Sequence, residues 1–223
     1  MTDAPQKTPA RRVLITAGPT HEPIDAVRYL ANRSSGRMGI AIAEAALGAG
    51  LDVTLLLGPV SASPPPGVNT LRFESAGDLE KLLQQHFPTC DILIMAAAVA
   101  DYRPAASAAG KLPRTGDRMT LELEPTPDLV AACARARRPE QRIIAFALEE
   151  PAVLARRASE KMHRKGVDAI VANPLDTMGA SNVSAIIFTS DGQAYMPPSD
   201  PHRPSSKSEF ARWLIEFILA RLT

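Results

Sequence analysis

Apolar and polar positions along the 223-residue chain fall into blocks that predict strands and helices in turn. Short apolar runs bounded by Gly, Pro or Ser predict strands, whereas runs with apolar residues three or four apart predict helices. The predicted strands cover residues 12–18, 52–59, 70–75, 91–99, 142–148 and 168–173. The predicted helices cover residues 35–49, 76–87, 126–136, 151–165 and 209–222.

This alternation predicts a Rossmann-like, doubly wound α/β fold with a mostly parallel sheet. The run at 91–99 is continuously apolar, as expected of a central strand covered on both faces. Residues 184–197 carry Asp191-Gly192, a turn signal that predicts a C-terminal β-hairpin extending the sheet or forming a flap. We expect a disordered N-terminal tail over 1–11 and one domain over 12–223.

Composition and charge narrow the possible functions. Lys and Arg number 25 against 24 Asp and Glu, and this balance predicts neither nucleic-acid nor membrane binding. Cys90 and Cys133 lie in apolar contexts, and no signal peptide or membrane-length apolar run is found. We therefore expect buried thiols in a cytoplasmic protein. The histidines show neither metal-ligand nor catalytic-triad spacing, and they are His21, His86, His163 and His202.

Residues 32–39, NRSSGRMG, have the composition of a phosphate-binding loop at a helix entrance. Glycines allow backbone amides to approach oxygen atoms, while the hydroxyls of Ser34 and Ser35 add donors. The segment is neither a P-loop nor a GxGxxG motif. A Ser-capped helix, with Gly39 allowing close packing on the sheet, explains the same residues. The link that starts at Gly18 exceeds the roughly 2–6 residues of a simple strand-to-helix turn, and its length favours a functional role.

Further polar groups follow the other predicted strands, where ligands bind in such sheets. Asp101 follows an alanine-rich strand end that leaves room for a ligand or for a closely packed helix. The next segment, 105–114, is rich in small residues, and we expect a mobile lid that carries Lys111 to a charged ligand. Composition alone favours the alternative, in which Lys111 is a solvated surface lysine.

Three further candidates lie later in the chain. Lys161 and Lys165 are four residues apart on a predicted helix, so they share one face, which is a solvated face in most helices. Phe146 ends a strand, where it stacks on a base or belongs to the core. Asn173 also ends a strand, where it donates to a phosphate or caps a turn. The residues alone therefore indicate a phosphate-handling α/β protein.

Several of these segments together resemble the phosphopantothenoylcysteine synthetase family. They are ITAGPTHEPIDAVRYLANRSSGRMG, AAAVADYRP with a lysine ten residues beyond its Asp, TPDLV, AFALEE and KGVDAIVANPL. The resemblance implies ligation of L-cysteine to 4′-phosphopantothenate through an acyl-nucleotide, in coenzyme A biosynthesis. Many bacterial members carry this domain behind a flavin-dependent decarboxylase. No such segment is present here, so we expect a free-standing synthetase without flavin.

The resemblance also implies roles for particular residues. The implied catalytic residues are Asn32 and Lys111. The implied nucleotide-binding residues are Gly18, Ser34, Gly36, Gly39, Asp101, Pro127, Asp128, Leu129, Val130, Phe146, Lys161, Lys165 and Asn173. The implied acyl-substrate residues are Asn32, Ala97, Ala98, Asp101, and Arg28 reaching from a partner subunit. A homodimer with shared sites follows, with Mg²⁺ held mainly by the triphosphate and not by a protein cage.

Four prolines or acids depart from the family pattern, namely Pro113, Pro125, Glu150 and Pro174. They affect the expected nucleotide contacts, not the reaction. Bacterial members use CTP and eukaryotic members ATP. Since Asp101, Lys111, Lys161 and Lys165 are retained as in bacterial members, we predict CTP, with ATP as the alternative.

Two other classes of protein stay open. A nicotinamide-dependent oxidoreductase shares this architecture, but the chain lacks GxGxxG and an acidic residue at the end of the second strand. The other class is a non-catalytic nucleotide-binding protein, whose function would not require Lys111. Pyrophosphate release with CTP, 4′-phosphopantothenate and cysteine separates all three.

Overall fold

The computed structural model describes residues 10–175, 182–198 and 205–223. Its centre is a sheet that has, in this part of the chain, eight strands in the order β13-β12-β10-β9-β6-β1-β4-β5. The strands are β1 (Arg12–Ala17), β4 (Asp52–Leu57), β5 (Asn69–Arg72), β6 (Ile92–Met95), β9 (Arg142–Glu149), β10 (Ala169–Pro174), β12 (Ile186–Thr189) and β13 (Ala194–Tyr195).

The neighbouring strands β10, β9, β6, β1, β4 and β5 all run parallel. Strands β12 and β13 are antiparallel and lie at one edge of the sheet. The predicted mostly parallel α/β sheet is therefore confirmed. The hairpin at Asp191-Gly192 extends this sheet, and the Gly192 amide closes its turn by donating to the Thr189 carbonyl at 2.9 Å. Of the predicted tail, residues 1–9 lie outside the described residues.

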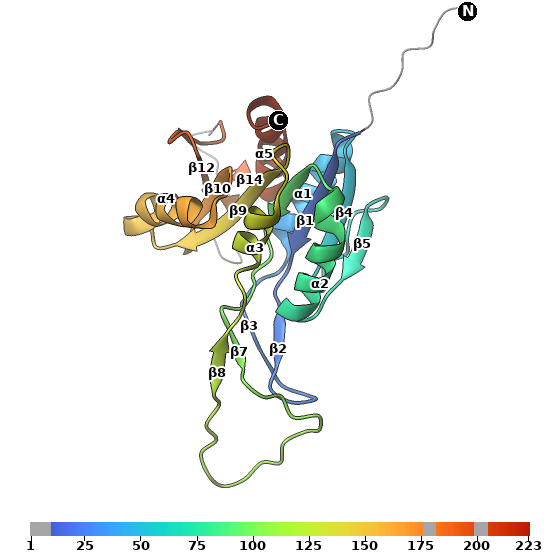
Figure 1. Ribbon diagram of the computed structural model, residues 1–223, viewed down its shortest axis with the longest axis vertical. Helices are drawn as coiled ribbons and strands as arrows, with labels where there is room; N and C mark the ends of the chain where they lie inside the picture. The colour runs from blue at the N-terminus through green and yellow to red at the C-terminus, as the bar shows by residue number, and fades with distance from the viewer. Residues whose placement is uncertain (1–9, 176–181, 199–204) are drawn as a thin grey trace, which may run out of the picture.

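Helices cover both faces of the sheet (Figure 1). One face carries α1 (Arg37–Gly48) and α5 (Lys207–Arg221), which pack against each other. The other carries α2 (Ala76–His86), α3 (Leu129–Ala136) and α4 (Leu154–Lys165). Two 3-10 turns, η1 (Phe87–Thr89) and η2 (Pro151–Val153), adjoin α2 and α4.

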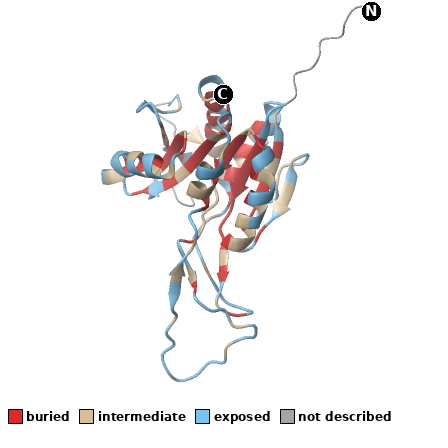
Figure 2. Ribbon diagram, in the orientation of Figure 1, coloured by how far each residue is buried: buried red, intermediate tan, exposed pale blue. Residues whose placement is uncertain are grey.

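Side-chain alternation along the strands accounts for these two layers. In β1, Val13 and Ile15 pack toward α1 and α5, whereas Leu14 packs toward the α2 side, and all three are at most 2% exposed. Buried residues accordingly concentrate in the sheet and on the inner faces of the helices (Figure 2). None of the described helices is long and apolar enough to cross a membrane.

Capping residues decide where the helices begin. Ser75 caps α2, in a capping box with Asp78. Ser206 forms a similar box with Glu209, so α5 begins at Lys207, two residues before the predicted start. The helix predicted from residue 126 begins at Leu129, because the Asp128 side chain accepts the Ala131 amide at 3.1 Å and caps α3.

The strand predicted over 91–99 is shorter than expected, because β6 ends at Met95. Its neighbour β1 ends at Ala17, where Gly18 adopts a left-handed conformation with φ of +85°. Beyond this point β6 has no continuous ladder partner, although the Ala98 amide donates to the Gly18 carbonyl at 2.8 Å. Residues 96–101 therefore leave the sheet as a loop.

Two short antiparallel hairpins, predicted as loops, project from the sheet (Figure 1). One pairs β2 (His21–Pro23) with β3 (Tyr29–Ala31), and the other pairs β7 (Tyr102–Pro104) with β8 (Leu123–Pro125). We call these hairpins, with the turn of the first and the segment 105–122 of the second, the arm. Each strand of the arm has three residues, which is too short for a periodic pattern to mark it.

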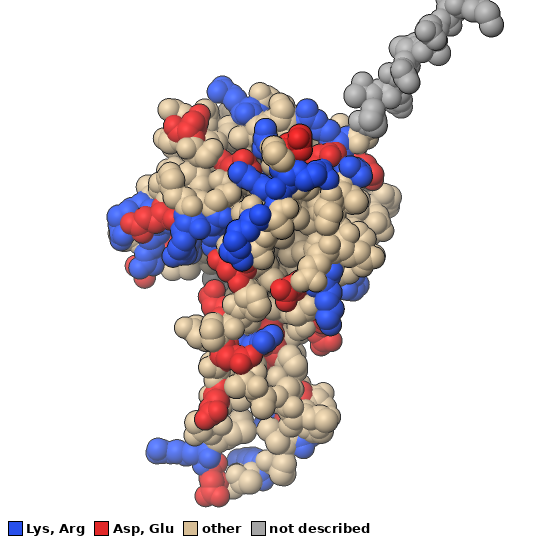
Figure 3. All heavy atoms as spheres, viewed as in Figure 1, with Lys and Arg blue, Asp and Glu red and all other residues tan. Residues whose placement is uncertain are grey.

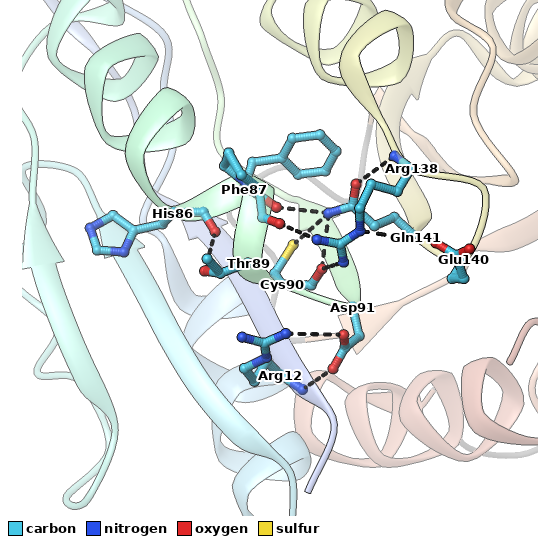
Figure 4. A network of polar contacts seen from close by, with 10 residues as sticks. Arg12, His86, Phe87, Thr89, Cys90, Asp91, Arg138, Glu140 and Gln141 are labelled. Atoms are coloured by element: carbon cyan, nitrogen blue, oxygen red, sulfur yellow. Dashed lines mark hydrogen bonds and ion pairs between the residues drawn. The ribbon is translucent and has the colours of Figure 1, made fainter. Parts of the chain in front are cut away.

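At the amino ends of the central strands, the 1% exposed Gln141 organises a polar network (Figure 4). Its Nε2 donates to the carbonyls of Phe87 at 2.7 Å and Cys90 at 2.9 Å, and its Oε1 accepts the Arg138 amide at 2.8 Å. Cys90 and Cys133 are buried free thiols, as predicted, and burial raises their pKa values to about 12 and about 11. This end of the sheet is fixed by packing and hydrogen bonds.

Candidate active site

A cavity of about 790 Å³ opens at the carboxyl ends of β6, β9 and β10, between the two helical layers. Its lining brings together residues from segments that are far apart in the chain. The residues proposed from the sequence that line it are Asn32, Ser34, Gly36, Gly39, Ala97, Ala98, Asp101, Pro127, Asp128, Leu129, Val130, Phe146, Lys161, Lys165 and Asn173. This is the position at which open α/β sheets bind ligands.

The α1 entrance forms one wall of the cavity. Gly36 occupies the N-cap position with φ of +70°, and no side chain caps the helix. The Ser-capped interpretation is therefore wrong, and the first amides of α1 stay available to an anion. Gly39 serves close packing, since a Cβ there would lie 2.4 Å from the Ala17 Cβ.

Asn32 connects this wall to the loop that follows β6. Its Nδ2 donates to the carbonyls of Val99 at 3.0 Å and Ala98 at 3.4 Å. Nearby, the Thr20 Oγ1 accepts the Ala100 amide at 3.0 Å. The alanine-rich segment lines the cavity, and these bonds fix the amide of Asn32 at its edge.

The opposite wall comes from α3 and α4. Lys165 pairs with Asp128 at 3.0 Å, and Lys161 pairs with Glu149. Burial raises the pKa of Asp128, but the Ala131 amide and Lys165 outweigh this effect and lower it. Figure 3 shows Lys and Arg side chains gathered over α4 with acidic side chains among them. The two lysines are thus fixed on the cavity wall and are not merely solvated.

Glu149 lies outside the cavity lining but pairs with Lys161 of the cavity wall, and sequence reasoning missed this role. It ends β9, is 4% exposed, and accepts ion pairs from Lys161 and, at 3.3 Å, from Arg157. Burial raises its pKa, but the two cations outweigh burial and lower it. The segment ALEE ends a predicted strand with two adjacent acids, Glu149 and Glu150. Their spacing does not show which of the two is buried.

Four cations of the lining were also missed, namely Arg33, Arg37, Arg164 and Lys207. In the described part of the chain, none of the four forms an ion pair with a carboxylate. Arg33 and Arg37 lie inside the quoted NRSSGRMG segment and could have been included. Lys207 could not, because the packing of α5 beside α1 brings it to the cavity.

Gly18, Arg28 and Lys111 do not line the cavity within the part of the chain that the structure describes. Gly18 lies behind it, where its Cα is 3.4 Å from a Cβ built on Gly36. Arg28 lies on the arm and pairs with the buried Asp25. Lys111 is exposed in the segment 105–122 of the arm.

The segment that carries Lys111 is attached to the first hairpin of the arm. Leu112 donates its amide to Asp25 at 3.1 Å and accepts a hydrogen bond from Arg28 at 3.1 Å. The Ala108 amide donates to the Ile24 carbonyl at 3.1 Å. Arg28 and the amides that contact Asp25 lower the pKa of that carboxyl, against the effect of burial. The predicted lid is thus docked on the first hairpin of the arm in this conformation.

Metal-ligating side chains do not gather in the described residues, where no group of three His, Cys, Asp or Glu could hold an ion. His202 lies outside the described residues. The acidic side chains that line the cavity are Asp101 and Asp128. Asp128 is used by α3 and Lys165, whereas Asp101 is exposed and forms no ion pair with a described residue.

Comparison with known proteins agrees with this geometry. The family model described as the DNA/pantothenate metabolism flavoprotein C-terminal domain matches residues 9–222. The chain belongs to this family. Its predicted resemblance to the synthetase domain of the bifunctional coenzyme A protein is thereby confirmed at family level.

Individual relatives support the same conclusion. The coenzyme A biosynthesis bifunctional protein CoaBC of Vibrio cholerae is 40% identical over 200 residues, covering 87% of this chain and 50% of that protein. A protein named Cysteine/Cysteine sulfinic acid decarboxylase, from an unknown prokaryotic organism, is 44% identical over 171 residues, covering 76% of this chain and 47% of that protein. The chain therefore spans about half the length of these curated relatives.

Among solved structures, the C-terminal domain of a CoaBC protein superposes with a TM-score of 0.80 and 36% identity. The match covers 95% of each chain. The chain therefore has the fold of that domain. The cavity at the strand ends is the candidate active site of the chain.

Proposed function

We propose that the chain ligates L-cysteine to 4′-phosphopantothenate in coenzyme A biosynthesis. The observation that carries this proposal is the single cavity in which the segments NRSSGRMG, AAAVAD, TPDLV and the α4 lysines meet. Family membership supports the same reaction. The cavity volume of about 790 Å³ is adequate for a nucleotide beside an acyl substrate.

The reaction proposed runs through an acyl-cytidylate. The substrate carboxylate attacks the α-phosphate of CTP, pyrophosphate leaves, and a mixed anhydride forms. The cysteine amine then attacks the acyl carbon, loses a proton and expels CMP. A carboxylate is a poor acyl donor without this step, because its leaving group would be oxide. The protein's task is to align the partners and to offset phosphate charge.

We assign the nucleotide to the α3 and α4 side of the cavity. Pro127 to Val130, Phe146, Asn173, Lys161 and Lys165 line the cavity. The two lysines would contact the phosphates of the nucleotide. The first turn of α1, with Ser34, Gly36 and Gly39, contributes amides and a hydroxyl to a phosphate. We propose CTP as the nucleotide, with ATP as the alternative, because the chain retains Asp101, Lys111, Lys161 and Lys165 as bacterial members do.

The acyl substrate lies along Ala97, Ala98 and Asp101, with Asn32 at the activated carbonyl. Hydrogen bonds to two backbone carbonyls already fix the Asn32 amide, which supports a positioning role. Mg²⁺ held mainly by the triphosphate would offset phosphate charge. Asp101 fits it as a hard oxygen ligand, because it lines the cavity without an ion pair to a described residue.

The active form proposed is a homodimer that shares its sites. Arg28 and Lys111 lie on the arm and are absent from the described lining of their own cavity. The arm also exposes large apolar side chains to between 47% and 60%, namely Val27, Tyr29, Tyr102, Met119 and Leu123. A second copy of the chain would cover these side chains and receive Arg28 in its site.

The test is pyrophosphate release by the purified chain, omitting 4′-phosphopantothenate, cysteine, CTP and Mg²⁺ one at a time. Loss of release without 4′-phosphopantothenate or nucleotide, and 4′-phosphopantothenoylcysteine identified by mass spectrometry, are expected. Replacing CTP by ATP decides the nucleotide. Nucleotide binding without turnover would instead identify a binding protein, and hydride transfer from a nicotinamide would identify the oxidoreductase.

A further inference from the structure

The carboxyl group of Glu22 lies at the joint between the arm and the rest of the domain. Glu22 belongs to β2, the first strand of the arm, yet it is only 2% exposed. Its Oε1 accepts the Ala76 amide at 2.9 Å, and Ala76 is the first residue of α2. One residue earlier, the His21 amide donates to the Glu74 carbonyl at 2.7 Å. Two consecutive residues of β2 are therefore hydrogen-bonded to the start of α2, beside which β2 lies in Figure 1.

Burial of this carboxyl group costs free energy, because Glu22 forms no ion pair with any described residue. The start of α2 offsets part of that cost, since the first amides of a helix lack partners within the helix and carry partial positive charge. The Ser75 side chain accepts the Asp78 amide, whereas the Ala76 amide is bound by Glu22. An apolar side chain at position 22 would take this acceptor away from the Ala76 amide.

The same joint sets the direction in which the arm leaves the sheet. A hydrogen bond fixes both a distance and an angle, whereas an apolar contact allows neighbouring groups to slide. Within the arm, β2 pairs with β3 in a register that sets Glu22 opposite Leu30. The second hairpin is bonded to the first, because the Leu112 amide donates to Asp25 at 3.1 Å. A change of angle at Glu22 would therefore be passed on to the whole arm, including Arg28.

We propose that Glu22 is a positioning residue that acts in the site of the partner subunit. It fixes the angle of the arm, and the arm delivers Arg28 of the same chain to the acyl substrate in that site. This inference rests on the proposed function, in which a homodimer shares its sites. Glu22 does not line the cavity that the described residues form, so its effect runs through the arm. In its own subunit, the carbonyls of Val99 and Ala98 hold Asn32 independently of Glu22.

The experiment first compares homodimers by steady-state formation of 4′-phosphopantothenoylcysteine. Glu22→Ala removes the acceptor and should lower kcat/KM for 4′-phosphopantothenate about 10-fold or more, the scale of a misplaced substrate contact. Glu22→Gln keeps an oxygen acceptor and should retain most of the activity. Glu74→Ala is the matched control and should change nothing, because its side chain is exposed and only its carbonyl bonds to β2. Wild-type kcat/KM in Glu22→Ala would overturn the proposal.

Two mixed dimers, each purified over two different tags, decide in which site Glu22 acts. With Glu22→Ala on one chain and Asn32→Ala on the other, one site carries both changes and the other neither, so about half of the wild-type activity should return. With Glu22→Ala on one chain and Arg28→Gln on the other, each site receives one altered arm, so the activity should stay low. The reverse pattern would place the effect of Glu22 in its own subunit, and low activity in both dimers would make Glu22 a residue of general stability. Either result overturns the proposal.

A third mixed dimer separates this inference from the proposed function. Arg28→Gln paired with Asn32→Ala contains no change at Glu22 and tests shared sites alone. If its activity stays low while wild type is active, the shared site is wrong and this inference falls with it. If wild type itself forms no 4′-phosphopantothenoylcysteine, the proposed reaction is wrong. Should Glu22→Ala fail to fold or to dimerise, the same two pairings are made with Glu22→Asp, which keeps the carboxyl group but shortens its reach.

Discussion

Glu149 is a buried carboxylate whose two partners both lie on α4, so it joins the end of β9 to the wall of the active site. We predict that Glu149→Gln lowers the free energy of unfolding at pH 7 by about 1–3 kcal/mol, the usual effect of leaving charged partners unmatched. The neighbouring exposed Glu150→Gln is the control and should have little effect. Urea titration monitored by circular dichroism measures both variants.

The same residue gives a pH dependence with a definite sign. Because the folded-state pKa of Glu149 is lowered, its stabilising effect is complete above the ordinary carboxyl pKa and is lost as the pH falls below it. Wild type should therefore lose stability as the pH falls below about 5, through and below the ordinary glutamate pKa of about 4.3, more steeply than Glu149→Gln. If the free energy of unfolding fell equally steeply with decreasing pH in both proteins, the cations of α4 would not be holding this carboxylate in its charged form.

Asn32 tests the chemistry at the scale of one side chain. Since its amide lies at the cavity edge and is not a charge partner, Asn32→Ala should keep nucleotide affinity and slow the conversion of the acyl-cytidylate. The intermediate should accumulate and be detected by mass spectrometry of quenched reactions. Wild-type flux through this variant would show that Asn32 does not act on the acyl group.

Individual site residues were predictable where a motif sits on one segment. Ser34, Gly36 and Asp101 follow strand ends, and parallel strands bring their carboxyl ends to one edge. Glu149 and Lys207 were not predictable, because the first depends on which of two adjacent acids is buried and the second on how α5 packs. Burial and helix packing arise from tertiary structure, which periodicity does not encode.

At the scale of elements, the segment 105–122 carries the proposed catalytic Lys111 away from its own cavity. We predict that Lys111→Gln slows acyl-cytidylate formation by about 10²-fold or more, the scale of losing one transition-state charge. The melting temperature should barely change, since the side chain is exposed. Single-turnover pyrophosphate release measures the step, and Arg114→Gln on the same segment is the control. A wild-type rate for Lys111→Gln would make Lys111 an ordinary surface lysine.

Elements with long apolar periods were predicted well, and short exposed ones were not. The central strands and α2 follow from their apolar patterns and caps. The arm did not, because each of its strands has three residues and its apolar side chains, such as Tyr29 and Tyr102, face outward. The strand beginning at Asp91 was predicted too long for a related reason, since alanines continue the apolar run after Gly18 has turned β1 away.

At the scale of the whole molecule, the arm bears on whether the protein forms a dimer. A projection with exposed apolar side chains would favour aggregation of a monomer, and in the proposed homodimer it would supply the interface. The docking of Leu112 on Asp25 and Arg28 makes the two hairpins one unit, so a partner that receives Arg28 also receives the segment around Lys111. Light scattering should therefore give about twice the 23.8 kDa chain mass.

Shared sites make a stronger prediction than dimer mass alone. Two differently tagged chains, one carrying Arg28→Gln and the other Asn32→Ala, are co-expressed and purified over both tags. If Arg28 acts in the partner's site, one site of this heterodimer carries both changes and the other carries neither, so about half of the wild-type activity should return. A heterodimer of Asn32→Ala with Lys161→Gln is the control, because both residues line their own subunit's cavity and each site keeps one lesion. Equally low activity in both heterodimers would place Arg28 in the site of its own chain.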